Sequence, residues 1–211
     1  VVLKGAGDKA FVSGADISEF EEVRNTPEQI EAYENVAGEC HAALQSLEIP
    51  LIAMIRGFCI GGGMAIALSA DLRITADDGQ FGVPAAKLGL GYGYGGIKEL
   101  MNIVGPSFAK EIFFTGGRFN ASNAETMGLV NRVVSVSELE ATVSTLAKTI
   151  ADNAPMTVKA AKAAIDEGTK NPDDRDLDRV SEMVEACFKS EDYKEGRRAF
   201  MEKRKPEFQG R

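Results

Sequence analysis

The feature that most constrains this chain is a glycine triplet between an apolar run and an alanine-rich run. The stretch from Arg56 to Asp71 reads R-G-F-C-I-G-G-G-M-A-I-A-L-S-A-D. It follows residues 50–55, an apolar run that predicts a buried strand, and it leads into residues of good helix propensity. Glycines between a strand and a helix permit a sharp turn and the close approach of another molecule. Free amides at such a turn can hold an anion or a developing oxyanion, and a plain tight turn explains the pattern about equally well.

Composition excludes several classes of protein. The chain has 211 residues and a net charge of −8, and 44% of its residues are hydrophobic. This balance is typical of a soluble globular protein and argues against a general nucleic-acid or anionic-membrane binder. Cys40, Cys59 and Cys187 lack metal-ligand spacing and predict free thiols, and His41 is the only histidine. We therefore expect no metal site.

The start of the chain limits what can be said about targeting. It begins at Val1, within a predicted strand, so we expect residues to precede it. We expect a cytoplasmic protein, and organellar targeting stays open because a leader would lie in the preceding residues. No apolar run reaches the roughly 18 residues of a membrane span.

Alternating strand and helix patterns predict an α/β fold. Strands are predicted at residues 1–3, 50–55, 71–76, 80–84 and 130–136. Helices are predicted from Pro27 to about Leu47, with Thr26 as N-cap, and at 96–104, 106–114 and 120–129. Four amphipathic helices follow, at 137–153, 155–168, 176–189 and 190–204. The change of pattern predicts a core domain at 1–135 and a helical region at 136–211.

Five motifs in order resemble one family. Residues 11–17 resemble F-x-x-G-A-D-I, and residues 57–63 resemble G-x-x-x-G-G-G. Residues 81–96 resemble F-G-x-P-x-x-x-L-G…G-G, residues 115–130 resemble T-G-x-x-x…A…G-L-V, and residues 195–204 resemble E-G-x-x-A-F-x-E-K-R. Together they are similar to the enoyl-CoA hydratase/isomerase (crotonase) superfamily, whose opening strands have no counterpart here.

The resemblance implies a fold, a ligand and an assembly. It implies a crotonase-like spiral of ββα units with a C-terminal helical trimerisation region, assembled as a homotrimer or a dimer of trimers. It also implies an acyl-CoA substrate and no separate cofactor, since coenzyme A is part of the substrate. Neither nucleic acid nor a membrane is an expected partner.

The resemblance also assigns site residues. The backbone amides of Ala15 and Gly62 would form an oxyanion hole for a thioester enolate, where each donor contributes on the order of 3–4 kcal/mol. Phe200 and Lys203 would help to hold the coenzyme A of a neighbouring subunit. The other expected substrate-binding residues are Ser13, Asp16, Ile17, Phe58, Ile60, Gly61, Ala65, Ala85, Leu90 and Tyr94.

Three positions depart from the family pattern. Hydratases of this family carry glutamates where this chain has Ala65 and Ala85. A methyl group neither activates water nor donates a proton, and losing one such group typically costs about 10²–10⁴-fold in rate. Standard hydration and glutamate-dependent isomerisation are therefore not expected. Gly93 stands where a family dehalogenase has its aspartate nucleophile.

Tyr92 is the remaining candidate for proton transfer. It matches a tyrosine in relatives that decarboxylate a malonyl-type CoA ester, and the alternative role for it, slightly favoured, is a wall of the acyl pocket. Three hypotheses follow: catalysis on a CoA thioester by a lyase of this family, decarboxylation of a malonyl-like ester using Tyr92, and non-catalytic acyl-CoA binding or assembly.

Overall fold

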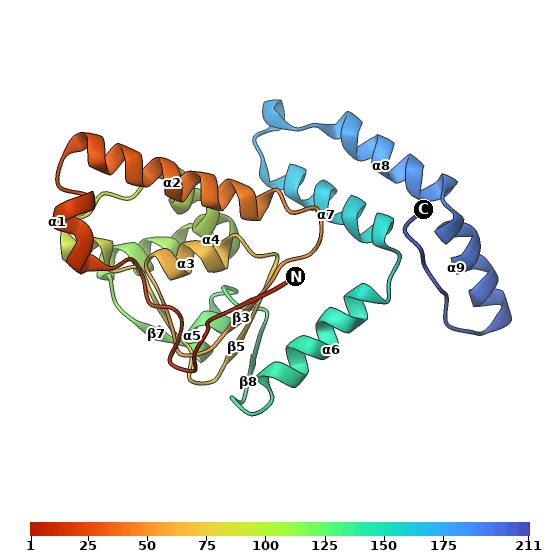
Figure 1. Ribbon diagram of the computed structural model, residues 1–211, viewed down its shortest axis with the longest axis horizontal. Coiled ribbons are helices and arrows are strands. Elements are labelled where there is room, and N and C mark those ends of the chain that lie inside the picture. The colour runs from red at the N-terminus through yellow and green to blue at the C-terminus, as the bar shows by residue number, and fades with distance from the viewer. The chain divides into compact units, whose positions relative to one another are not determined.

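Two four-stranded sheets form the core of the protein (Figure 1). The computed structural model describes the backbone of residues 1–211 and every side chain except that of Glu21. The first sheet is parallel, in the order β1 (Val2–Lys4), β3 (Ile52–Ile55), β5 (Leu72–Ala76), β8 (Arg132–Val134). The second has the order β2 (Ala10–Val12), β4 (Phe58–Ile60), β6 (Gln80–Gly82), β7 (Phe119–Asn120), and only β7 is antiparallel in it. Strands β1 to β6 alternate between the two sheets, β7 stays beside β6 in the second sheet, and β8 returns to the first, so the chain winds as a spiral.

One sequence prediction here was wrong. We expected the run 50–55 to lead directly into the glycine turn, but a separate strand, β4, lies between them. Gly57 divides the two strands. Its φ is +60°, and a methyl group on it would lie 2.0 Å from the Lys9 carbonyl oxygen. The chain therefore bends at Gly57 and changes sheets, which places β4 beside β2.

Seven helical segments accompany the strands of this unit. They are η1 (Ile17–Glu19), α1 (Phe20–Val23), α2 (Pro27–Gln45), α3 (Gly62–Leu68), η2 (Pro84–Leu88), α4 (Tyr94–Thr115) and α5 (Ala121–Thr126). Figure 1 shows α2, α3 and α4 along the same side of the strands, and His41 of α2 bonds Ser69 at the end of α3, with Nδ1 2.8 Å from Oγ. Thr26 caps α2 as predicted, in a capping box with Gln29. Predicted helices 96–104 and 106–114 are the two halves of α4, which breaks at Gly105.

A buried arginine holds the end of α3. The Arg73 guanidinium, on β5, donates to the carbonyl oxygens of Ala70 (2.6 Å), Leu129 (2.7 Å) and Ala67 (3.4 Å). Burial lowers the Arg73 pKa, and the nearby charge of Asp71 opposes that shift. Carbonyls at helix ends lack partners within the helix, so one side chain stabilises the ends of two segments and fixes α3 against the sheet.

Four predicted helices make up the C-terminal segment. They are α6 (Leu139–Ala151), α7 (Pro155–Thr169), α8 (Leu177–Lys189) and α9 (Glu191–Glu202), with a short η3 (Pro172–Asp174) before α8. Contacts divide the chain into a core unit of residues 2–47 and 51–143 and a C-terminal unit of residues 1, 48–50 and 144–211. The boundary predicted between residues 135 and 136 stays a prediction. In the part of the chain that the structure describes, no helix has both the length and the apolar character needed to span a bilayer.

Candidate active site

The glycine turn between β4 and α3 is built by close backbone contact. A methyl group on Gly63 would lie 2.0 Å from the Val12 carbonyl oxygen, so only glycine lets β2 approach this closely. The Gly61 amide donates to the Gly82 carbonyl at 2.9 Å, and Gly61 has a φ of +54°. The end of β2, the turn and the end of β6 are thus held together by main-chain groups.

Two exposed main-chain amides meet at this turn. A methyl group on Gly62 would lie 3.9 Å from the Ala15 nitrogen, so the two backbones are neighbours although the residues are far apart in sequence. Within the described part of the chain, neither the Ala15 nor the Gly62 amide donates to another protein group. Both residues are exposed. Two unpartnered main-chain donors therefore lie near one another at this turn.

Residues that follow Ala15 form a small capped turn. One Asp16 carboxylate oxygen, Oδ1, accepts from the Ser18 hydroxyl at 2.6 Å and from the Ser18 amide at 3.0 Å. These bonds lower the Asp16 pKa, with the hydroxyl the larger cause. Asp16 thus caps η1, and its Oδ1 atom is occupied there. Ser13 and Ile17 are exposed beside it.

Phe58 and Ile60 lie on one face of β4, with the buried Cys59 on the other. The Arg118 guanidinium lies 5.2 Å from the centre of the Phe58 ring, a cation–π contact that no sequence motif predicted. Burial raises the pKa of the Cys59 thiol to about 12, against a smaller opposing influence of Arg73. Cys59 is therefore a core residue and not a nucleophile.

Ala65 and Ala85 stand at the two positions where the family resemblance predicts a glutamate. Ala65 is half-buried in the first turn of α3, and Ala85 is buried in η2. The Ala85 carbonyl accepts from the Leu90 amide at 3.0 Å, which closes the loop, and the Leu90 side chain packs against the core. Neither site offers a group that exchanges a proton.

Tyr92 is half-buried, whereas Tyr94, the first residue of α4, is 74% exposed. The Tyr92 ring lies against Phe113, with ring centres 5.0 Å apart in an edge-to-face arrangement. Burial raises the Tyr92 pKa, and the charges of Glu99 and Glu34 raise it further. The phenol therefore stays protonated at neutral pH and can donate a hydrogen bond or a proton. Motif reasoning missed Phe113, Glu34 and Glu99, since each lies far from Tyr92 in sequence or in another helix.

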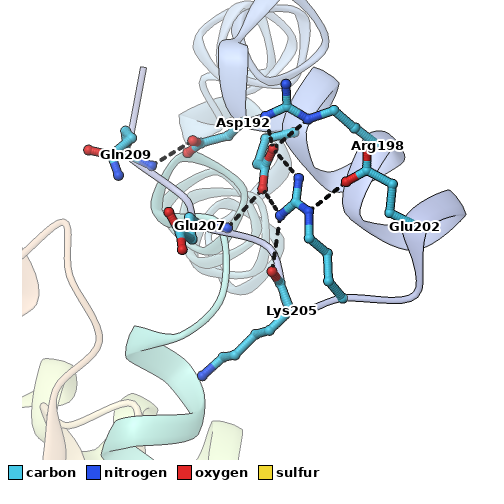
Figure 2. Close-up of polar contacts among 8 residues, drawn as sticks. Asp192, Arg198, Glu202, Lys205, Glu207 and Gln209 are labelled. Atoms are coloured by element: carbon cyan, nitrogen blue, oxygen red, sulfur yellow. Dashed lines mark hydrogen bonds and ion pairs between the residues drawn. The ribbon is translucent and has the colours of Figure 1, made fainter.

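Phe200 and Lys203 belong to the C-terminal unit. Phe200 is 82% exposed on α9, and Lys203, with a φ of 54°, ends that helix. A charge network binds the following tail to α9. Glu195 accepts from Arg198, from Arg204 and from the Glu207 amide. Figure 2 shows Asp192 beside Gln209, whose amide donates to it at 2.7 Å.

Among the described residues, no group of three or more His, Cys, Asp or Glu side chains is placed to hold a metal ion. The core unit thus presents two neighbouring unpartnered amides, at Ala15 and Gly62, and elsewhere a half-buried phenol, Tyr92.

Comparison with known proteins assigns the family. The family model for enoyl-CoA hydratase/isomerase matches residues 1–211. A short-chain-enoyl-CoA hydratase of Clostridium acetobutylicum is 43% identical over 98% of this chain and 78% of its own length. A crotonyl-CoA hydratase of Syntrophomonas wolfei is 36% identical over 99% of this chain and 79% of its own length.

Solved structures agree with the sequence relatives. The crystal structure of an enoyl-CoA hydratase/carnithine racemase from Magnetospirillum magneticum superimposes with a TM-score of 0.92. It is 36% identical and covers 100% of this chain, which spans 78% of it. The chain therefore belongs to the enoyl-CoA hydratase/isomerase family of acyl-CoA enzymes, and the predicted crotonase fold is confirmed. The individual roles of the site residues stay predictions.

Proposed function

We propose that this protein is an enzyme that forms an enolate from an acyl-CoA thioester and stabilises it with the amides of Ala15 and Gly62. The observation that carries this proposal is the meeting of these two exposed, unpartnered amides at the glycine turn. Preorganised main-chain donors act on charge as it develops on the thioester oxygen, and they need no reorganisation during the reaction. Ser13, Ile17, Phe58, Ile60 and Gly61 surround the substrate in this proposal.

The absence of the two expected carboxylates narrows the set of reactions that we propose for this site. Ala65 and Ala85 supply neither a base for water nor an acid for the α carbon, so the proposed reaction is not the two-glutamate hydration. Tyr92, kept protonated, supplies the proton donor in this proposal. The proposal needs no separate cofactor, because the negative charge of the enolate is delocalised onto the thioester oxygen.

Decarboxylation of a malonyl-like CoA ester is the second candidate, and the protonated Tyr92 favours it. The bond from the α carbon to the carboxylate breaks, carbon dioxide leaves, and the bonding electrons form the enolate. The α carbon then takes a proton from the Tyr92 phenol, and water returns a proton to the phenolate. This sequence needs no catalytic base, which agrees with the methyl groups at Ala65 and Ala85.

A comparison of the Gly62→Pro and Gly62→Ala variants tests the oxyanion hole. Proline is tolerated in the first turn of a helix, where it removes the amide donor. Gly62 is the first residue of α3, and a Cβ fits there. We expect the proline variant to turn over its thioester about 10²–10³-fold more slowly than the alanine variant. Assays use crotonyl-CoA and methylmalonyl-CoA. Equal rates in the two folded variants would refute the oxyanion role, and tight acyl-CoA binding without any turnover would favour a binding protein.

A homotrimer or a dimer of trimers is part of the proposal. An apolar cavity of about 890 Å³ in the C-terminal unit is lined by α7, α8 and α9, and Phe200 and Met201 beside it are about four-fifths exposed. A second subunit would cover this surface, with Phe200 and Lys203 holding its coenzyme A. Light scattering of the purified chain measures the assembly directly.

A further inference from the structure

Two distant parts of α4 hold the Tyr92 ring. A methyl group on Gly96 would lie 2.7 Å from Cε1, 3.5 Å from Cδ1 and 3.7 Å from Cζ of Tyr92, so the ring covers the bare backbone of the first turn. The Phe113 ring, near the other end of α4, meets Tyr92 edge to face with centres 5.0 Å apart. One side chain is thus in contact with both halves of the same helix.

A straight helix cannot make both contacts. Phe113 follows Gly96 by 17 positions, and at about 1.5 Å per residue a straight helix would separate them by about 25 Å, beyond the span of one aromatic ring. The structure resolves this with a break at Gly105, where φ is 76° and ψ is 166°, followed by Pro106. The break redirects the second half of α4 and lets Phe113 reach Tyr92.

The Tyr92 ring is the nearest obstacle to a side chain at Gly96. Its φ lies outside the left-handed region, and helix interiors favour alanine over glycine by about 1 kcal/mol. The three atoms nearest to a Gly96 methyl group all belong to the Tyr92 ring. A distance of 2.7 Å is too short for two carbon atoms, so any larger residue would displace the ring.

We propose that Gly96 and Phe113 are positioning residues that fix the Tyr92 phenol for its reaction with the acyl group, and that the break at Gly105 lets one helix supply both. This inference rests on the proposed function, because it gives the fixed phenol a substrate to act on. The raised Tyr92 pKa agrees with it, since a ring held in a half-buried place feels both desolvation and the charge of Glu99, one turn beyond Gly96.

Gly96→Ala is the test, and Gly95→Ala is its matched control. Gly95 is the neighbouring residue of the same first turn, and a methyl group there would meet nothing within 4 Å. We expect Gly96→Ala to lower kcat about 10- to 100-fold with KM changed less than about 3-fold, because small displacements of a reacting group are costly. Gly95→Ala should keep the parent kcat. Phe113→Leu, which removes the other contact, should lower kcat in the same direction.

A double variant separates positioning from general damage. In a Tyr92→Ala background the obstructing ring is gone, so adding Gly96→Ala should change kcat by less than about 2-fold. An equal loss of kcat from Gly96→Ala with and without Tyr92 would overturn the proposal. So would a Gly96→Ala enzyme with the same kcat as Gly95→Ala.

Titration of the phenol keeps this test independent of the proposed function. The chain has four tyrosines, and ultraviolet difference absorbance against Tyr92→Phe isolates the Tyr92 transition. Gly96→Ala should move the Tyr92 pKa down, towards its ordinary value of 10.0, as the ring leaves its half-buried place. If no thioester is turned over, the proposed function fails while the titration still decides the positioning. If the Tyr92 pKa is the same in the folded Gly96→Ala variant as in the parent protein, the proposal that Gly96 positions the ring is wrong.

Discussion

The glycine turn and the C-terminal tail are two ordered regions held by opposite means. At the turn, β2, β4 and α3 meet through main-chain groups, and Gly57 and Gly63 stand where a methyl group would be 2.0 Å from a backbone oxygen. In the tail, residues 205–211 lie along α9 because charged side chains hold them, among them Asp192 and Glu195 (Figure 2).

This difference indicates which substitutions each region tolerates. A turn held by backbone contacts does not depend on the side chains nearby, and methyl groups at Ala65 and Ala85 are compatible with it. It does not survive an added Cβ where two backbones touch. The tail tolerates added bulk on its exposed face but depends on charge, and hence on pH and on salt.

Gly63→Ala should give the largest effect on stability. Its methyl group would lie 2.0 Å from the Val12 oxygen and 2.9 Å from the Val12 Cβ, and neither backbone can move freely. We expect the free energy of unfolding to fall by about 3 kcal/mol, at the upper end of overpacking effects. Urea denaturation measures this loss.

Gly38→Ala is the control for that prediction. Gly38 also lies inside a helix, α2, but a methyl group there meets nothing within 4 Å. It should stabilise the protein by up to about 1 kcal/mol, as helix propensity alone predicts. Similar effects of the two substitutions would show that close backbone contact does not hold the turn.

Glu195→Gln should have a smaller effect, confined to the C-terminal unit. The Glu195 carboxylate accepts from Arg204, Arg198 and the Glu207 amide, and an amide side chain cannot accept from all of them. Hydrogen exchange of residues 205–211 should quicken more than in Glu191→Gln, which breaks one exposed ion pair with Lys194. Equal exchange in both variants would show that the network does not hold the tail.

The Glu195 carboxylate makes the stability of the tail depend on pH. Bonds from Arg204, then Arg198 and the Glu207 amide, lower the Glu195 pKa far below its usual 4.5. A carboxyl whose pKa falls on folding stabilises the folded state fully above about pH 4.5, and that stabilisation is lost as pH falls further. The protection of the tail amides, which is their exchange rate relative to the intrinsic rate at each pH, should therefore fall below about pH 4.5 in the parent protein, and should fall less steeply in Glu195→Gln.

Local signals in the sequence predicted much of the fold. Thr26 caps its helix as expected, and the four C-terminal helices follow their amphipathic patterns. The strand β4 was missed because three residues carry too little periodicity. Arg73 was read only as part of an alternating strand, yet it is buried. Its burial depends on helix carbonyls at residues 67, 70 and 129, and no local pattern reveals such contacts.

The candidate site was predictable to the extent that its motifs are local. The resemblance assigned Ala15 and Gly62 to one oxyanion hole, and the closeness of the two backbones agrees with that assignment, although their role stays a prediction. The surroundings of Tyr92 were not predictable. Phe113 and Gly96 reach its ring only because α4 breaks at Gly105, a long-range result of chain geometry.

Glu99→Gln should give the smallest effect, and it tests whether charge matters in the core unit as it does in the tail. Glu99 is one of two carboxylates that raise the Tyr92 pKa, after burial, and Gln45 holds it through a 2.5 Å bond from Nε2 to Oε1. Replacing the carboxylate by an amide of the same shape removes the negative charge, so deprotonation of the phenol becomes easier and its pKa should fall by a fraction of a unit. Stability should change little. Glu111→Gln, an exposed substitution on the same helix, is the control, and a difference spectrum against Tyr92→Phe reads the transition. An unchanged Tyr92 transition in Glu99→Gln would mean that burial alone tunes this phenol, and that within the core unit packing outweighs charge at the candidate site.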